Sequence, residues 1–131
     1  MEFTGIYIYI DGCDLDEVGD SIVFELQKWV SSNKINARVI NDKFEKTPDM
    51  EPDDYPDWNL GLNLDNSKNL SKELSLIIPF MNNVAVKHKR DFVLGYYDSE
   101  TNISEDIEYF GYERKKNTTD IENSVREFLC I

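Results

Sequence analysis

Apolar and polar residues alternate with period two in several stretches of the chain, and each such stretch predicts a strand. Near the start, isoleucines at positions 6, 8 and 10 alternate with Tyr7 and Tyr9, so the isoleucines face one side of a central strand and the aromatic rings the other. The same pattern predicts further strands at residues 37–44, 58–65, 92–97 and 107–112. Because residues 99–104 are polar and turn-forming, we expect the last two strands to form a hairpin.

Apolar residues at helical spacing predict three helices, at about residues 17–32, 71–88 and 119–129. Asp16 is the expected N-cap of the first helix, and Thr119 with Glu122 forms a capping-box pattern at the start of the last. Pro79 lies inside the second helix and lacks an amide hydrogen, so we expect it to kink or split that helix.

The order of the predicted elements is β-α-β-β-α-β-β-α, which indicates an α+β fold. Its first six elements match the split β-α-β, or ferredoxin-like, pattern. We therefore predict a single domain over residues 1–131, with a split β-α-β antiparallel sheet extended by a C-terminal strand and helix.

The charge of the chain restricts its possible partners. The 131 residues include 26 acidic and 14 basic side chains, for a net charge of −12. Such a charge repels nucleic acids and anionic membrane surfaces, and it attracts basic proteins. We expect a basic protein partner, with no nucleic acid and no membrane.

The N-terminus and the cysteines indicate a cytoplasmic location. The apolar run at residues 6–10 is preceded by Glu2 and closed by Asp11, unlike a secretory signal. Cys13 and Cys130 do not have the spacing of a zinc site, and we expect them to be reduced thiols.

Acidic residues gather in stretches without bases. In a split β-α-β sheet, the turn after the first strand and the loop between the second and third lie at one edge. That edge would collect nine carboxylates: Asp11, Asp14, Asp16, Glu17, Asp49, Glu51, Asp53, Asp54 and Asp57. This acidic rim either binds a basic surface or a cation that relieves the repulsion, or is a solvated region that contributes only solubility.

The candidate chemistry for catalysis is sparse. Asp11, Asp14 and Asp16 follow the first strand and could hold a hard cation in a metal-dependent hydrolase, but their spacing fits no EF-hand loop. His88, flanked by lysines, is the one histidine, and we expect it to be solvated at a helix end. No GxSxG, Walker A or GxGxxG pattern occurs. We predict a protein that is not an enzyme, with no catalytic residue, metal or cofactor.

Aromatic residues near the acids are candidates for binding. Tyr55 and Trp58 flank the acidic loop, and Tyr and Trp among charges are typical of interface hot spots. The hairpin adds a second group, Tyr96, Tyr97, Tyr109, Phe110 and Tyr112. Alternation sends some of these rings to the face opposite the core, unless the helix at residues 119–129 covers that face.

In size, acidity, absence of an export signal and lack of a catalytic motif, the chain resembles the immunity proteins of bacterial toxin–immunity systems, including those of contact-dependent growth inhibition. The resemblance implies that the protein neutralises a cognate toxin domain, often a nuclease with a basic groove. The alternatives are a nucleic-acid mimic that inhibits a DNA- or RNA-binding protein, a metal-dependent hydrolase and a small adaptor.

Overall fold

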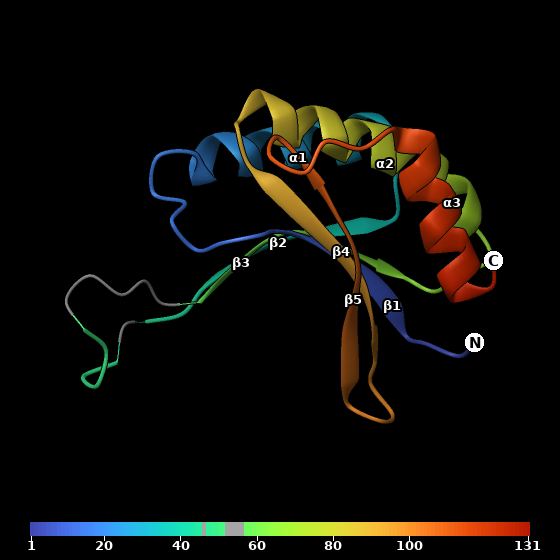
Figure 1. Ribbon diagram of the computed structural model, residues 1–131, viewed down its shortest axis with the longest axis horizontal. Coiled ribbons are helices and arrows are strands. Elements are labelled where there is room, and N and C mark those ends of the chain that lie inside the picture. Colours follow the sequence, from blue (N-terminus) through green and yellow to red (C-terminus); the bar gives the residue numbers. More distant parts are fainter. Residues whose placement is uncertain (46, 52–56) are drawn as a thin grey trace.

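The computed structural model describes residues 1–45, 47–51 and 57–131. Its elements follow in the order β1 (Gly5–Ile10), α1 (Gly19–Ser32), β2 (Ala37–Lys43), β3 (Trp58–Asp65), α2 (Leu70–Lys87), β4 (Asp91–Asp98), β5 (Ile103–Gly111) and α3 (Thr118–Leu129). The strands form one sheet in the order β2-β3-β1-β4-β5, and every neighbouring pair is antiparallel. The three helices all lie on one side of this sheet (Figure 1). The predicted α+β fold with an antiparallel sheet is therefore confirmed.

The central strand β1 separates the two faces of the sheet. Its Ile8 is paired with Leu62 on β3 and with Leu94 on β4, and all three side chains are fully buried beneath the helices. Tyr7 and Tyr9 point to the other face and are only partly buried. Period-two alternation in the sequence thus produces one apolar face and one aromatic face.

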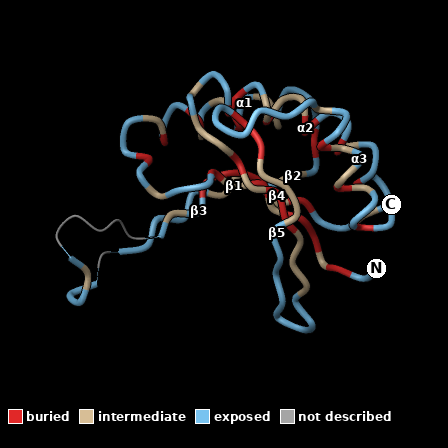
Figure 2. The backbone as a smooth tube through the Cα atoms, in the orientation of Figure 1, coloured by how far each residue is buried: buried red, intermediate tan, exposed pale blue. Residues whose placement is uncertain are grey.

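The core lies between the sheet and the helices, where the buried residues of Figure 2 gather. The helix α2 contributes most to it among the three helices. Each of the apolar residues that share its predicted inner face is buried: Leu70, Leu74, Ile77, Ile78, Met81, Val84 and Ala85. Within the described residues, no helix is long and apolar enough to cross a membrane.

The predicted helix caps are wrong. Val18, rather than Asp16, is the N-cap of α1, and no side-chain hydrogen bond caps that helix. Asp16 instead forms an ion pair with Lys43 at the end of β2. At α3 the N-cap is Asn117, whose Oδ1 accepts a hydrogen bond of 2.8 Å from the amide of Thr119, so the helix begins one residue before Thr119.

Pro79 does not split α2, which runs without a break from Leu70 to Lys87. The residues on both sides of the proline are anchored, because Ile78 and Met81 are fully buried against the sheet. In addition, Arg126 of α3 binds the preceding turns, donating to the Ser71 carbonyl at 2.5 Å and to Ser75 Oγ at 2.8 Å. Tertiary contacts therefore hold the helix through the position where proline removes a backbone donor.

Candidate functional site

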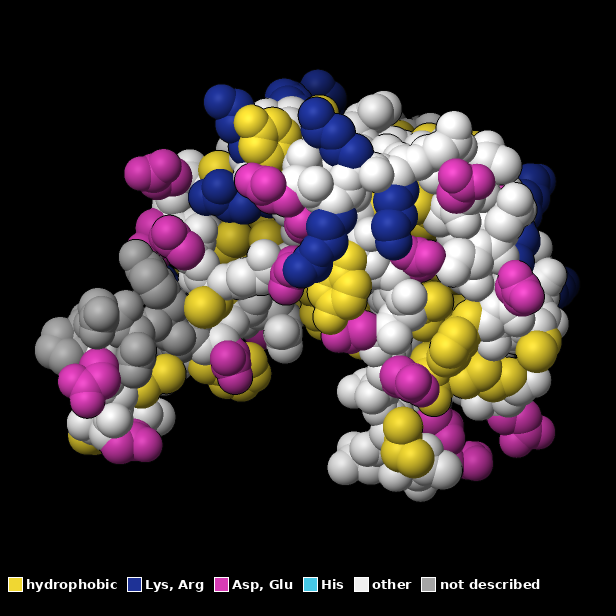
Figure 3. All heavy atoms as spheres, viewed as in Figure 1, with side chains coloured by type: hydrophobic (Ala, Val, Ile, Leu, Met, Phe, Trp, Pro, Cys, Tyr) yellow, Lys and Arg dark blue, Asp and Glu magenta, His cyan; other side chains and the backbone are white. Residues whose placement is uncertain are grey.

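The face of the sheet that the helices leave uncovered carries an open groove of about 630 Å³. The groove crosses all five strands and is lined by Tyr7, Tyr9, Ile10, Arg38, Asn59, Asn63, Val93, Tyr97, Ser104 and Asp106. Figure 3 shows the hollow below the middle of the molecule, beside the β4–β5 hairpin. This surface, which we call the open face, is the main candidate for a functional site.

Two tyrosine rings of the open face, those of Tyr7 and Tyr97, lie over glycines of the neighbouring strands. In the strand register, Tyr7 is opposite Gly95, Tyr9 is opposite Gly61 and Tyr97 is opposite Gly5. A Cβ atom at Gly95 would lie 2.2 Å from Tyr7 Oη. A Cβ atom at Gly5 would lie 2.6 Å from Tyr97 Oη. The glycines therefore leave the space in which the tyrosines lie across the sheet.

The same arrangement brings two of the rings into contact. Tyr7 and Tyr9 stack with their centroids 5.2 Å apart and their planes inclined by 27°. The result is a stacked pair of rings on β1, in the middle of the sheet, which we call the aromatic platform.

Asp106 on β5 closes the groove on the hairpin side. Its two carboxylate oxygens accept hydrogen bonds from two tyrosines, Oδ1 from the hydroxyl of Tyr7 and Oδ2 from the hydroxyl of Tyr109 at 2.7 Å. Burial raises the pKa of Tyr7 far above its ordinary value, and the hydrogen bond to Asp106 raises that pKa further. The Tyr7 hydroxyl therefore stays protonated at neutral pH and remains a donor to the carboxylate.

Hydrogen bonds also fix the polar groups on the β2 side of the groove. Tyr9 donates to Asn63 Oδ1 at 2.6 Å, and burial raises the pKa of this tyrosine. Arg38 forms an ion pair of 3.0 Å with Asp65 and lies 3.4 Å from Tyr97 Oη, to which it donates. The hydrogen bond with Asp65 is the largest cause of the raised pKa of Arg38. The open face thus presents rings and polar groups that are already held in place.

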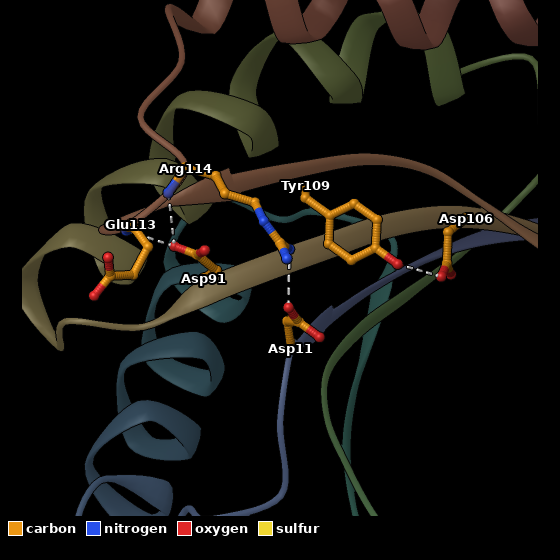
Figure 4. A network of polar contacts seen from close by, with 6 residues as sticks. All are labelled: Asp11, Asp91, Asp106, Tyr109, Glu113 and Arg114. Carbon is orange, nitrogen blue, oxygen red and sulfur yellow. Dashed lines mark hydrogen bonds and ion pairs between the residues drawn. The ribbon is translucent and has the colours of Figure 1, made fainter.

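A second network connects the rim to the hairpin (Figure 4). The guanidinium of Arg114 lies 4.5 Å from the centroid of the Tyr109 ring and forms an ion pair of 3.0 Å with Asp11. The carboxylate of Asp91 accepts a hydrogen bond of 2.8 Å from the amide of Glu113. Asp11 is therefore held by a base from more than one hundred positions further along the chain.

The acidic rim is partly assembled and partly neutralised. The end of β1 lies beside the start of β3, since Tyr9 is opposite Gly61, and Asp16 reaches Lys43 at 3.2 Å. Lys43 also lies 4.5 Å from the centroid of the Trp58 ring. Basic residues from elsewhere in the chain thus accompany Asp11 and Asp16, and the segregation of charge along the sequence is reduced in space.

The remaining rim residues are exposed or not described. Asp14, Glu17, Asp49, Glu51 and Asp57 are exposed. A hydrogen bond from the side chain of Thr47 lowers the pKa of Asp49. Three predicted binding residues, Asp53, Asp54 and Tyr55, lie outside the described residues.

Trp58 is directed to the helix side of the sheet. A Cβ atom on Gly19 of α1 would lie 3.2 Å from its ring, and its Nε1 donates to Asn41 Oδ1 at 2.7 Å. The ring is therefore partly buried and packs against the core.

The hairpin aromatics divide between the two faces as alternation requires. Tyr96 and Phe110 lie on the helix side, where the Tyr96 ring is 5.9 Å from that of Phe128 in α3. Tyr97 and Tyr109 lie on the open face. The C-terminal helix therefore covers the side that already holds the core, and the open face stays uncovered.

Arg38, Asn63 and Asp106 were not among the residues that sequence reasoning selected, although they line the groove. The available signal was the alternation of isoleucine with Tyr7 and Tyr9 in the central strand, which predicts an aromatic outer face. The strand pairing that brings Asp106 to Tyr7 spans 99 positions, and the local pattern does not contain it.

His88 is not solvated as expected. Its side chain is only 11% exposed, and Nε2 lies 2.6 Å from Glu25 Oε2, so it joins the end of α2 to α1. Asp11, Asp14 and Asp16 do not assemble a metal site, and among the described residues no group of three or more His, Cys, Asp or Glu side chains could hold a metal ion.

No family model, curated protein or solved structure matches the chain.

Proposed function

We propose that the protein is a non-enzymatic binding protein that uses its open face to hold and neutralise a basic protein domain, such as the toxin domain of a bacterial toxin–immunity pair. The observation that carries the proposal is the uncovered sheet face, a groove in which stacked tyrosines lie beside carboxylates. Tyrosine supplies a large, rigid and amphipathic contact surface, and its hydroxyl needs a partner only where it is buried.

Charge supports a basic partner. The net charge is −12, and among the described residues Asp42, Asp65 and Asp106 lie on or beside the open face. Complementary charge mainly accelerates association and disfavours acidic partners. In the view of Figure 3, Lys and Arg side chains gather over the helix layer, whereas Asp and Glu are spread over that layer and over the lower part of the molecule, where Lys and Arg are sparse.

Two finer assignments belong to the same proposal. The position of β1 between β3 and β4, with one helix after β1 and one after β3, supports a split β-α-β arrangement to which β5 and α3 are added. A cytoplasmic location is the second assignment, as the sequence predicts.

The experiment compares two variants of equal charge change on opposite sides of the molecule. Asp42→Lys with Asn59→Lys places two lysines on the open face, where these residues are cross-strand partners. Asp20→Lys with Gln27→Lys makes the same change of charge on exposed positions of α1. The parent and both variants are immobilised as full chains, exposed to a lysate of the encoding organism, and the captured proteins are identified by mass spectrometry.

We expect a basic domain to be captured by the parent and by the α1 variant, and lost from the open-face variant. Co-expression of the chain should then suppress the toxicity or the enzymatic activity of that domain. Capture that is lost only with the α1 variant, or a captured partner that is acidic, would contradict the proposal. Capture of a nucleic-acid-binding protein that DNA displaces would instead favour the mimic alternative.

A further inference from the structure

Two basic side chains of this protein have the same kind of surroundings: each contacts an aromatic ring and a carboxylate. Arg114 lies over the ring of Tyr109 and pairs with Asp11. Lys43 lies over the ring of Trp58 and pairs with Asp16. A cation between a ring face and a carboxylate combines cation–π attraction with an ion pair.

Asp106 has the aromatic neighbours of such a site but no cation. Its carboxylate is bound by the hydroxyls of Tyr7 and Tyr109, and among the described residues no basic side chain forms an ion pair with it. It lines the groove beside the stacked Tyr7 and Tyr9 rings, and its own residue is exposed.

We propose that Asp106 and the Tyr7–Tyr9 platform form a binding site, called the arginine seat below, for the guanidinium group of one arginine of the partner domain. This inference rests on the proposed function and names the anchoring contact on the open face.

The geometry of the carboxylate favours a planar, two-pronged donor. Each oxygen accepts one tyrosine hydroxyl and retains a second lone pair, so both oxygens remain available to a bidentate guanidinium. The two hydroxyls also fix the orientation of the carboxylate before a ligand arrives, which reduces the entropy cost of binding. A guanidinium in this position would lie beside Tyr7, whose hydroxyl binds the same carboxylate.

Charge complementarity favours a cationic side chain of the partner at Asp106. The base that lines the groove, Arg38, is already paired with Asp65 on the β2 side, so the Asp106 side remains anionic. Arginine fits better than lysine because its planar group stacks on rings and donates two parallel hydrogen bonds, whereas an ammonium acts as a point charge.

The test uses a blocked Gly-Arg-Gly tripeptide and its Gly-Lys-Gly counterpart as probes, titrated into the full ¹⁵N-labelled chain at low salt and followed by NMR. The variant is Asp106→Asn, which keeps the size of the side chain and its ability to accept from Tyr7. The matched control is Asp20→Asn, which removes the same charge from an exposed position of α1, on the helix side of the molecule.

We expect saturable shifts centred on Tyr7, Gly95 and residue 106 with the arginine probe, and binding about tenfold weaker in Asp106→Asn, as expected for loss of a charge-assisted hydrogen-bonded pair. The lysine probe should bind several-fold more weakly than the arginine probe, and Asp20→Asn should retain binding. Equal binding by parent and Asp106→Asn, equal binding of the two probes, or shifts centred on the helices would overturn the seat.

Failure of the seat and failure of the proposed function are distinguishable. If the tripeptide does not bind but a basic domain is captured through the open face, only the arginine seat is wrong. If the tripeptide binds at Asp106 but no basic domain is captured, the seat stands as a cation site and the neutralising function is wrong.

Discussion

At the scale of single residues, the open face depends on pairs of tyrosine and glycine. Tyr7 crosses the sheet above Gly95, and Tyr97 crosses it above Gly5. Both positions require glycine, because a Cβ atom there would collide with the tyrosine side chain. Each hydroxyl then reaches a polar partner, as Tyr7 does with Asp106 and Tyr9 with Asn63. The surface is therefore rigid without being apolar, which suits a site that has to remain exposed until a partner binds.

Tyr7 should make the stability of the protein sensitive to high pH. Burial and the bond to Asp106 raise its pKa in the folded chain above the value near 10 that the unfolded chain retains. The stabilisation that the protonated Tyr7 hydroxyl contributes to the folded state is therefore fully present below about pH 10. It is lost as the pH rises from there through the folded-state pKa. We expect the free energy of unfolding, measured with urea between pH 8 and pH 11, to fall less steeply in Tyr7→Phe than in the parent.

The control for this measurement is Tyr112→Phe, which changes an exposed tyrosine beyond the end of β5. This variant should follow the parent across the whole pH range. A Tyr7→Phe profile as steep as that of the parent would show that the Tyr7 hydroxyl does not contribute to the pH dependence.

The cap of α3 gives a second prediction at this scale. Asn117 accepts from the amide of Thr119, so Asn117→Ala should lower the free energy of unfolding by about 1 kcal/mol. The capping-box pattern of the sequence assigns the same role to Thr119, and the structure does not. Thr119→Ala should therefore change stability by less than about 0.5 kcal/mol in urea unfolding. The reverse order of effects would restore the sequence-based assignment.

At the scale of elements, the hydrophobic pattern was a reliable guide and the polar details were not. The five strands and three helices occur close to where alternation and helical spacing predicted them, because burial of one face requires that periodicity. The largest difference is β5, which begins at Ile103, four residues before the predicted strand. The inner face of α2 was predicted residue by residue. The caps of α1 and α3 were missed because a serine-, threonine- or aspartate-type cap competes with other partners, as Asp16 does with Lys43.

The candidate site was less predictable than the fold for the same reason. The aromatic face of β1 follows from alternation, but the pairs that shape the groove join distant positions, as Tyr7 with Asp106 and Arg38 with Asp65 do. The charge pattern misled in a similar way, since Asp11 acquires its base from Arg114. Strand order decides these contacts, and no local pattern contains it.

Arg126 connects two elements and should be important for their packing. From α3 it binds Ser71 and Ser75 of α2, and its side chain is 21% exposed. Arg126→Met keeps much of the apolar stem but removes these hydrogen bonds. We expect a loss of about 1–3 kcal/mol in the free energy of unfolding, together with faster amide exchange in α3.

Two further variants make this prediction specific. Lys115→Met removes an exposed base outside α3 and should leave both measurements close to the parent. Arg126→Lys keeps the charge but not the planar donor group, so it should be intermediate. If Arg126→Lys were as stable as the parent, charge alone and not the hydrogen-bond geometry would join the helices.

At the scale of the whole molecule, the excess of negative charge is the property that acts over the longest distance. The 26 acids outnumber the 14 bases, and several ion pairs are largely solvated, as in the pair of Arg38 and Asp65, whose side chains are both more than half exposed. Such pairs each contribute between about 0 and 1 kcal/mol. The net charge of −12 therefore opposes folding through repulsion between the acidic side chains, and it favours the approach of a basic partner.

Screening this repulsion should stabilise the isolated protein. The screening length falls from about 30 Å at 0.01 M salt to about 10 Å at 0.1 M. We expect Tm to rise by a few degrees as sodium chloride increases from about 0.01 to 0.5 M, because 1 kcal/mol corresponds to roughly 4 °C in a domain of this size. Differential scanning calorimetry at constant pH measures the change.

Matched variants distinguish net charge from particular ion pairs. Replacing the exposed Glu2, Glu17 and Asp42 with their amides removes three negative charges, from −12 to −9, and should reduce the response of Tm to salt. Replacing the exposed Lys28, Lys72 and Lys115 with glutamine changes the charge from −12 to −15 and should increase that response. A Tm that falls with salt in the parent, or that responds equally in both variants, would mean that local ion pairs rather than the net field control the electrostatics of folding. The electrostatic attraction of a basic partner would then have to depend on the carboxylates of the open face rather than on the charge of the whole molecule.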